Sequence, residues 1–494
     1  MSYIERLNDI SRGGDRSVTQ QIIDVITAAI ADGELRPGDR LPATREIADI
    51  VGVNHLTAVR AYRRMREQGQ VSARVGAGTF VRDPRVVDAA ADEPGWQRFV
   101  LPPAAPSDHS RATSRAHDQA VSPGVVPFAV GYPPTRALPA ELWARHTADA
   151  LAELGPEALQ YGPIEGVPAL REQIAAMHGE AAEDVMVVNG AMQGLSLAAR
   201  ALIRPGEAVA VESPTFMGTI EVLRQVGARI VPIPVDDEGI DVDELARVAV
   251  REDLRAAFIQ SRLQNPTGAD LSPARCARLV ELARRHAFFI VDDEVWAELR
   301  FEGEEAPCLR DQDPAHVITL GSLSKTLGGG LRLGWIRASG GMVERLALAK
   351  HSDDLHSPTL TQHAAARLLA AGDYGPHLER MREEYQRGRE LMLDALERHL
   401  APMASWTTPA GGSCVLVTLD AEVDDRALVA EAERAGVSLV PGSALCAGPA
   451  PGTIMRLAYG YVEPDAIELG VRRLAQAVRA VRAERRARQA FPLS

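Results

Sequence analysis

Hydrophobic residues near the start of the chain recur at helical spacing. Within residues 18–31, Ile22, Ile26 and Ala29 fall on one face, which predicts an amphipathic helix. The elements predicted after it are a helix over residues 45–51, a third helix to about residue 68, and two short strands within 71–81 joined by a glycine turn at 76–78. Three helices followed by a hairpin are typical of a winged helix-turn-helix.

From about residue 125 the pattern changes to short apolar runs that alternate with amphipathic helices. The predicted strands are residues 185–188, 208–211, 256–259, 288–291 and 317–320. This alternation predicts an α/β domain with a mostly parallel sheet, in which ligands collect at the carboxyl ends of the strands.

A proline-rich segment separates the two patterns, and we expect it to be a linker. The predicted domains are therefore 1–82, a winged helix-turn-helix; 83–124, the linker; and 125–494, an α/β domain ending in a small α+β part.

The charge is uneven along the 494 residues. The net charge of -13 argues against a chain that coats nucleic acid along its whole length. Residues 1–82, however, hold 12 arginines against 10 acidic residues, a net charge of +2, which leaves -15 for the remainder. A small basic module on an acidic body permits local DNA binding.

The cysteines and the N-terminus further narrow the class of protein to which the chain can belong. Cys276, Cys308, Cys414 and Cys446 lack the spacing of a metal site or a disulfide framework. No apolar run is long enough to span a membrane, and the N-terminus lacks the apolar core of a signal peptide. We therefore expect a cytoplasmic protein with no bound metal and no membrane partner.

The chain contains only two lysines, and one of them, Lys325, lies among serines and glycines after the strand at 317–320. A partly desolvated lysine can supply a neutral amine for Schiff-base chemistry, whereas arginine effectively never deprotonates. Ser322 and Arg332 flank it and could bind a phosphate. The alternative is a surface lysine in a flexible glycine-rich loop.

Other polar or aromatic residues also follow predicted strands. Residues 189–193 form a strand-to-helix turn whose N–H groups suit a phosphate. Phe216 could stack on a planar ring, and the acids at 292–294 end an apolar run, where a buried carboxylate needs a partner. Taken singly, these features also fit a plain tight turn and core packing.

The N-terminal module resembles the GntR-type DNA-binding domain. The motifs that carry the resemblance are residues 35–42, 45–48, 52–57 and 76–81. The resemblance implies that Asn54, His55 and Thr57 open a recognition helix in the major groove, that Arg45 holds a phosphate and that Gly76 lies at the wing tip. The family usually has Ser-Arg where this chain has Asn54 and His55, which leaves the contact made by His55 open.

The larger domain resembles fold-type I aminotransferases, through the stretch around Lys325 and through Asn265-Pro266-Thr267-Gly268. The resemblance implies pyridoxal 5'-phosphate (PLP) bound to Lys325. The residues it implies around the cofactor and its substrate are Ala191, Met192, Ser322, Arg332 and, from the other subunit, Tyr161 at the phosphate; Phe216, Asn265, Asp293 and Trp296 at the ring; and Arg456 at a substrate carboxylate. The family commonly has tyrosine at Trp296, a hydroxyl residue at Ala191 and often proline at Gly329.

The two halves in this order resemble the MocR/GabR class of bacterial transcription regulators. That resemblance implies a head-to-tail homodimer, a double-stranded DNA operator, and a regulator that senses an amine, an amino acid or PLP through aldimine chemistry at Lys325. A working aminotransferase with an accessory DNA-binding domain is the alternative, and a dimerisation scaffold that binds only free cofactor is a third reading. Trp296 cannot act as an acid or base, which favours sensing.

Overall fold

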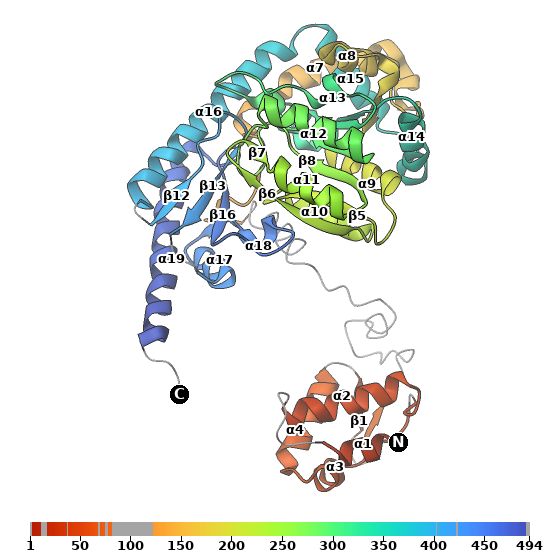
Figure 1. The fold of residues 1–494 in the computed structure, drawn as a ribbon, viewed down its shortest axis with the longest axis vertical. Helices are drawn as coiled ribbons and strands as arrows, with labels where there is room; N and C mark the ends of the chain where they lie inside the picture. Colours follow the sequence, from red (N-terminus) through yellow and green to blue (C-terminus); the bar gives the residue numbers. More distant parts are fainter. Residues whose placement is uncertain are drawn as a thin grey trace. The chain divides into compact units, whose positions relative to one another are not determined.

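The computed structural model describes residues 2–10, 17–36, 38–67, 70–74, 78–81, 122–401, 403–420 and 423–490. The chain divides into two compact units, Met1–Ala105 and Pro106–Ser494 (Figure 1). Each unit is described by itself below.

The first unit is a winged helix-turn-helix, as predicted. Its elements are α1 (Tyr3–Asn8), α2 (Val18–Ala31), α3 (Thr44–Val51), α4 (His55–Glu67), β1 (Val71–Arg74) and β2 (Gly78–Val81). The apolar faces of the helices meet in one core, in which Ile22, Ile47 and Met65 are fully buried. β1 and β2 pair antiparallel as the wing. Helix α1 was not predicted; a Ser2–Glu5 capping box begins it, and Leu7 packs into the same core.

The second unit is built on an eight-stranded sheet in the order β4-β11-β10-β9-β8-β5-β6-β7. The strands are β4 (Val185–Val188), β5 (Ala208–Ser213), β6 (Arg229–Asp236), β7 (Gly239–Ile240), β8 (Leu254–Ile259), β9 (Phe289–Asp293), β10 (Val317–Ser322) and β11 (Gly334–Arg337). The run β10-β9-β8-β5-β6 is parallel, while β11 and β7 are antiparallel to their neighbours. The prediction of a mostly parallel sheet is confirmed.

Helices cover both faces of this sheet (Figure 1). They are α7 (Ala140–Leu154), α8 (Pro168–His178), α9 (Ala191–Leu202), α10 (Met217–Gln225), α11 (Val242–Arg251), α12 (Pro273–His286), α13 (Leu309–Gln312), α14 (Gly341–Asp354) and α15 (Thr359–Ala370). Side chains alternate across β5: Val209 and Val211 pack with α9, α10 and α14, whereas Ala208 and Ala210 pack with α11, α12 and α13. Burial on both faces explains why the strands appear as continuous apolar runs.

A smaller α+β part follows the long helix α16 (Tyr374–His399). Its sheet has the order β12-β13-β16-β15. Its elements are β12 (Ala404–Trp406), β13 (Cys414–Leu419), α17 (Asp425–Arg434), β14 (Val437–Ser438), β15 (Val440–Pro441), α18 (Gly442–Leu445), β16 (Ile454–Ala458) and α19 (Pro464–Ala490). β14 pairs with β3 (Val126–Pro127), which ties the start of the second unit to its end.

Short 3₁₀ turns complete the second unit. They are η1 (Thr135–Ala137), η2 (Gly155–Leu159), η3 (Ala182–Asp184), η4 (Ala297–Leu299), η5 (Leu323–Lys325) and η6 (Gly329–Leu331). Across the described ranges, no helix has both the length and the apolar character to cross a membrane.

Candidate functional site

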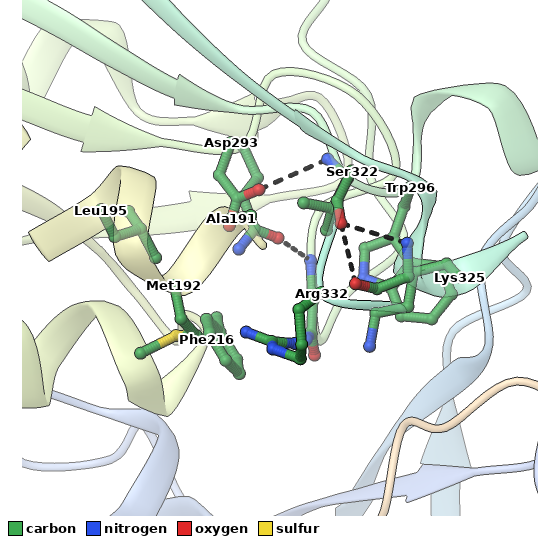
Figure 2. A pocket seen from close by; sticks show the side chains of 13 residues that line it. Ala191, Met192, Leu195, Phe216, Asp293, Trp296, Ser322, Lys325 and Arg332 are labelled. Carbon is green, nitrogen blue, oxygen red and sulfur yellow. Dashed lines mark hydrogen bonds between the residues drawn. The ribbon is translucent and has the colours of Figure 1, made fainter. Parts of the chain in front are cut away.

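A cavity of about 130 Å³ opens at the carboxyl ends of the central strands. Nine of the predicted cofactor contacts line it: Ala191, Met192, Phe216, Asn265, Asp293, Trp296, Ser322, Lys325 and Arg332. In the view of Figure 2, Phe216 and Met192 lie to the left of the cavity and Trp296 and Lys325 to the right. These nine residues, from six separate stretches of chain, thus meet because parallel strands end at one edge of the sheet.

Lys325 ends the 3₁₀ turn η5, which follows β10 directly. Its Nζ donates to the carbonyl oxygen of Gly131 at 2.8 Å and lies 4.8 Å from the centroid of the Trp296 ring. Burial and, to a smaller extent, the charge of Arg456 lower the pKa of the Lys325 ammonium to about 8, while Asp293 acts in the opposite direction. The lysine can therefore supply a neutral amine near physiological pH.

The three consecutive acids at the end of β9 have three different environments. Asp292 is fully buried and accepts from the Ser261 N–H and hydroxyl at 2.9 and 2.6 Å. Glu294 is paired with two arginines. Asp293 faces the cavity, and burial raises the pKa of its carboxyl to about 6. Of the three acids, Asp293 is therefore the one available to a ligand in the cavity.

The turn between β4 and α9 forms one wall of the cavity. Gly190 has φ +79°, and a Cβ there would meet Arg332 Nη2 at 2.6 Å. Arg332 Nη2 donates to the carbonyl oxygen of Asn189 at 2.7 Å, and Ala191 and Met192 begin α9. The first N–H groups of a helix have no intrahelical partner, so this turn and Arg332 together suit an anion.

Serine hydroxyls lie next to this turn. Ser322 Oγ is 2.9 Å from Ser324 Oγ and donates to the carbonyl oxygen of Leu333 or to Ser324, while it accepts from the Ser324 N–H at 3.1 Å. Both serines line the cavity, although only Ser322 was predicted to do so.

Asn265 and Arg456 meet beside the cavity. Arg456 Nη1 donates to Asn265 Oδ1 at 3.4 Å and Nη2 donates to the carbonyl oxygen of Ala129 at 2.5 Å. Arg456 is 4% exposed, and its Nε has no hydrogen-bond partner in the part of the chain that the structure describes. A buried guanidinium with a spare N–H is suited to a carboxylate.

Trp296 lies directly beside Lys325. It is the face of the indole, not its N–H edge, that meets Lys325 Nζ. The ring is 4% exposed and packs edge-on against Tyr385, with centroids 6.1 Å apart. Trp296 thus forms an apolar wall next to the lysine.

Tyr161 is the predicted cofactor contact that does not line the cavity of its own chain. Its side chain is 76% exposed, and its ring packs edge-on against His356 with centroids 5.0 Å apart. This placement leaves Tyr161 accessible to a second molecule.

The predicted DNA contacts lie at the helix-turn-helix. Arg45 on α3 and Asn54 and His55 at the start of α4 are exposed, and Thr57 is half-buried. His55 Nε2 is 2.9 Å from Thr44 Oγ1, so the two helices of the motif are joined at their N-terminal ends. Gly76 lies outside the described residues.

Sequence reasoning missed four lining residues: Leu195, Gln260, Val295 and Ser324. Gln260 Oε1 accepts from the Asn265 N–H at 2.6 Å and so orients that loop. Its position at the end of β8 was the available signal, because the strand at 256–259 was predicted and strand ends carry ligand contacts.

Comparison with known proteins agrees with this division of the chain. Residues 123–474 match the family described as aminotransferase class I and II, and residues 18–81 match the bacterial regulatory proteins of the gntR family. The class defined is thus a DNA-binding regulator with an aminotransferase-like body.

Relatives share both halves. The HTH-type transcriptional regulator TauR of Rhodobacter capsulatus is 30% identical over 95% of this chain and 98% of its own length. The probable rhizopine catabolism regulatory protein MocR of Rhizobium meliloti is 28% identical over 95% of both chains. A solved structure, the multiple substrate aminotransferase of Thermococcus profundus, has 30% identity and a TM-score of 0.72 over 78% of this chain and 98% of its own. The chain belongs to the aminotransferase class I and II family, within the MocR/GabR type of regulators that begin with a GntR-type DNA-binding domain.

The family implies PLP as the cofactor and DNA as a partner. The groups that line the cavity fit PLP: an amine at Lys325, a carboxyl group at Asp293, and a turn suited to an anion beside Arg332. Gly190 adds to this fit, since any Cβ would displace the Arg332 guanidinium.

Proposed function

We propose that this chain is a PLP-dependent transcription regulator that binds the cofactor covalently at Lys325 and senses an amine, an amino acid or PLP itself. One observation carries the proposal: a partly desolvated lysine, a buried acid and an anion-binding turn share one cavity in a chain that also has a DNA-binding unit. The predicted boundaries, 1–82, 83–124 and 125–494, are part of the proposal.

Each residue has a defined task in this proposal. When bound, PLP supplies an aldehyde that condenses with primary amines and a ring that withdraws electrons. The turn at Ala191 and Met192, with Ser322 and Arg332, would hold the phosphate. Phe216 would stack on the ring, and Asn265 and Asp293 would form hydrogen bonds with polar groups at its edge.

The remaining contacts concern the effector and the assembly. Arg456 would bind the carboxylate of an amino-acid effector, and Trp296 would exclude water beside Lys325. Tyr161 would reach the phosphate of the other subunit in a head-to-tail homodimer.

The DNA-binding unit is expected to act on an operator in the cytoplasm. Arg45, Asn54, His55, Thr57 and Gly76 are its proposed contacts, with one recognition helix from each subunit. An effector that binds the two arrangements of the dimer unequally would change operator affinity.

The first test is the visible absorption spectrum of the purified protein titrated with PLP. We expect a new band in the wild type and none in Lys325→Ala. Lys325→Arg is the matched control, because it keeps the charge but supplies no neutral amine. After borohydride reduction, the cofactor mass is expected on the peptide that contains Lys325 and not on the one that contains Lys350. A wild type without the band would overturn the covalent site.

Aminotransferase activity is the second candidate, favoured because the residues predicted for the cofactor ring all line one cavity. The two functions separate when the loaded protein is given amino acids and then oxo acids. A regulator is expected to show a persistent spectral shift with one ligand class and a changed affinity for DNA selected from random duplexes. Repeated turnover between amino and oxo acids, without any change in DNA affinity, would favour the enzyme.

A further inference from the structure

The second lysine of the chain, Lys350, is buried behind the turn that begins α9. Its side chain is fully buried, and its Nζ donates to Asp354 Oδ1 at 2.9 Å. Both residues lie on α14, one helical turn apart. A sequence with 54 basic residues and only two lysines keeps one of them here. The site needs a compact ammonium, since the planar guanidinium of arginine is larger and has a different donor geometry.

Asp354 connects this lysine to the turn. Its Oδ2 accepts from the side-chain amides of Asn189 and of Gln193, the second at 2.7 Å. Gln193 Oε1 in turn accepts from the Asn189 N–H at 2.7 Å. Asn189 is thus held through its backbone N–H and its side chain, while its carbonyl oxygen accepts from Arg332.

The end of α14 is shaped to permit this contact. The His356 N–H donates to the carbonyl oxygen of Asp354 at 2.7 Å, across Leu355 with φ +63° and ψ -52°. These angles define a γ-turn of the rarer, strained form, and a leucine adopts it only where the surroundings require it. The turn ends the helix at once, so that the Asp354 carboxylate faces the β4–α9 turn while His356 faces Tyr161.

We propose that Lys350 and Asp354 are positioning residues for the cofactor's phosphate. Asp354 holds residues 189–193 in the conformation that presents the first N–H groups of α9 to the cavity. Lys350 offsets the charge of Asp354, which would otherwise repel a phosphate dianion through the turn. The inference rests on the proposed function, because it assumes that PLP binds at Lys325.

The test compares PLP with pyridoxal, which has the same aldehyde and ring but no phosphate. Both dissociation constants are measured by the absorption change of the full-length protein. Lys350→Met keeps the volume and removes the charge; it is expected to weaken PLP binding about 10- to 100-fold and pyridoxal binding by less than about 3-fold. Arg345→Met is the matched control, since Arg345 lies on the same helix but donates to Ala201 at the far end of α9.

Gln193→Leu is the second variant, because it removes two of the amide contacts without leaving a buried charge unpaired. It keeps the proposal testable if Lys350→Met does not fold, as judged by circular dichroism. A loss of the PLP preference over pyridoxal in either folded variant supports the positioning role. An unchanged ratio in both, with normal PLP binding by the wild type, overturns this inference alone. A wild type that binds neither aldehyde overturns the proposed function instead.

Discussion

At the scale of single residues, the surroundings of an ionisable group decide whether it serves the ligand or the fold. Asp292 has its hydrogen bonds satisfied by Ser261, so it stabilises the loop after β8. Asp293 accepts only a long bond, from the Val295 N–H at 3.3 Å, among its described contacts. A buried carboxylate with spare acceptor capacity is costly unless a ligand completes it. Asp293 therefore favours a cofactor with a ring N–H.

The pH dependence of PLP attachment follows from the pKa values of Lys325 and Asp293. The neutral Lys325 amine is the nucleophile, and with a pKa of about 8 the attachment rate should rise about tenfold per pH unit below pH 8 and level off above it. With an Asp293 pKa of about 6, PLP affinity should fall as the pH drops below 6, because the protonated carboxyl no longer bears the charge that favours the ring N–H. Stopped-flow absorbance measures the rate, and equilibrium titration measures the affinity.

Asp293→Asn is the control for this assignment. It should abolish the fall in affinity below pH 6 and weaken PLP binding about 10- to 100-fold above it, the range of a charge-assisted hydrogen bond. It should also move the rise in rate to lower pH, because the Asp293 charge favours the ammonium form of Lys325. A pH profile identical to that of the wild type would contradict the role of Asp293.

At the scale of elements, the cavity depends on how β4 and β10 end. β10 passes directly into the 3₁₀ turn that carries Lys325, and β4 passes through Gly190 into α9. A Cβ at Gly334 on β11 would meet the backbone carbon of Gly190 at 2.8 Å. The close packing of these backbones fixes the distance between the lysine and the anion-binding turn.

Gly190→Ala tests the role of the turn between β4 and α9 in binding the phosphate. Its Cβ would meet Arg332 Nη2 at 2.6 Å, so the guanidinium must move, and φ +79° with ψ 161° is a conformation essentially confined to glycine, which adds strain of about 1–3 kcal/mol. PLP affinity should fall at least about tenfold, with pyridoxal affected less, since the loss concerns the phosphate. Titration of both aldehydes measures the effect.

Gly206→Ala is the matched control, because Gly206 has φ +88° but nothing within 4 Å of an added Cβ. It should lower thermal stability through its positive φ and leave PLP affinity unchanged. Equal loss of affinity in both variants would mean that backbone strain, and not the contact with Arg332, is responsible.

The elements that the sequence predicted correctly are those in which buried positions recur regularly along the chain. Helix α2 was predicted at residues 18–31, and the buried strands were predicted within a few residues, because a strand covered on both faces has no polar positions. The edge strand β7 is only two residues long, and β11 follows the glycine-rich stretch, so neither had a clear pattern. Helix α1 is too short for its period to be recognised.

The contacts of the candidate site also divide into those that the sequence could predict and those that it could not. Contacts that follow predicted strands, such as Asp293 and Ser322, were predicted from their positions. Asp354 was not, because it lies 165 residues from Asn189 along the chain and only tertiary packing brings the two together. Lys350 was noted only as a second lysine, since burial on a helix with little amphipathic pattern is not visible in the sequence.

At the scale of the whole molecule, exposed apolar side chains mark a surface of the second unit that suits contact with another molecule. Leu159 is 74% exposed and Tyr161 76% exposed, and Leu355 beside His356 is 48% exposed. Large apolar groups gathered at such exposure are typical of an interface. Because Tyr161 does not line its own chain's cavity, the proposed head-to-tail homodimer would give each cavity a tyrosine from the opposite subunit.

Mixed dimers test this sharing directly. Two differently tagged subunits, one carrying Lys325→Ala and the other Tyr161→Ala, are co-expressed and purified as the heterodimer. If Tyr161 acts across the interface, one cavity per heterodimer regains both residues and should bind PLP with wild-type affinity, while the other cavity forms no covalent adduct. The Tyr161→Ala homodimer should bind about tenfold more weakly at both cavities, the loss expected for one hydrogen bond to a charged group. Absorption titration gives both the number of sites and their affinity.

The matched control places both substitutions in one subunit and pairs it with a wild-type subunit. In this arrangement the intact lysine faces an alanine from its partner, so the single covalent site should be weak if Tyr161 acts in trans and tight if it acts within its own chain. If Tyr161 acts in trans, the first heterodimer therefore has the tight site and the second the weak one. If Tyr161 acts within its own chain, the two results are reversed. Tight binding only in the second heterodimer would show that Tyr161 serves its own subunit, and the head-to-tail arrangement would lose its main support.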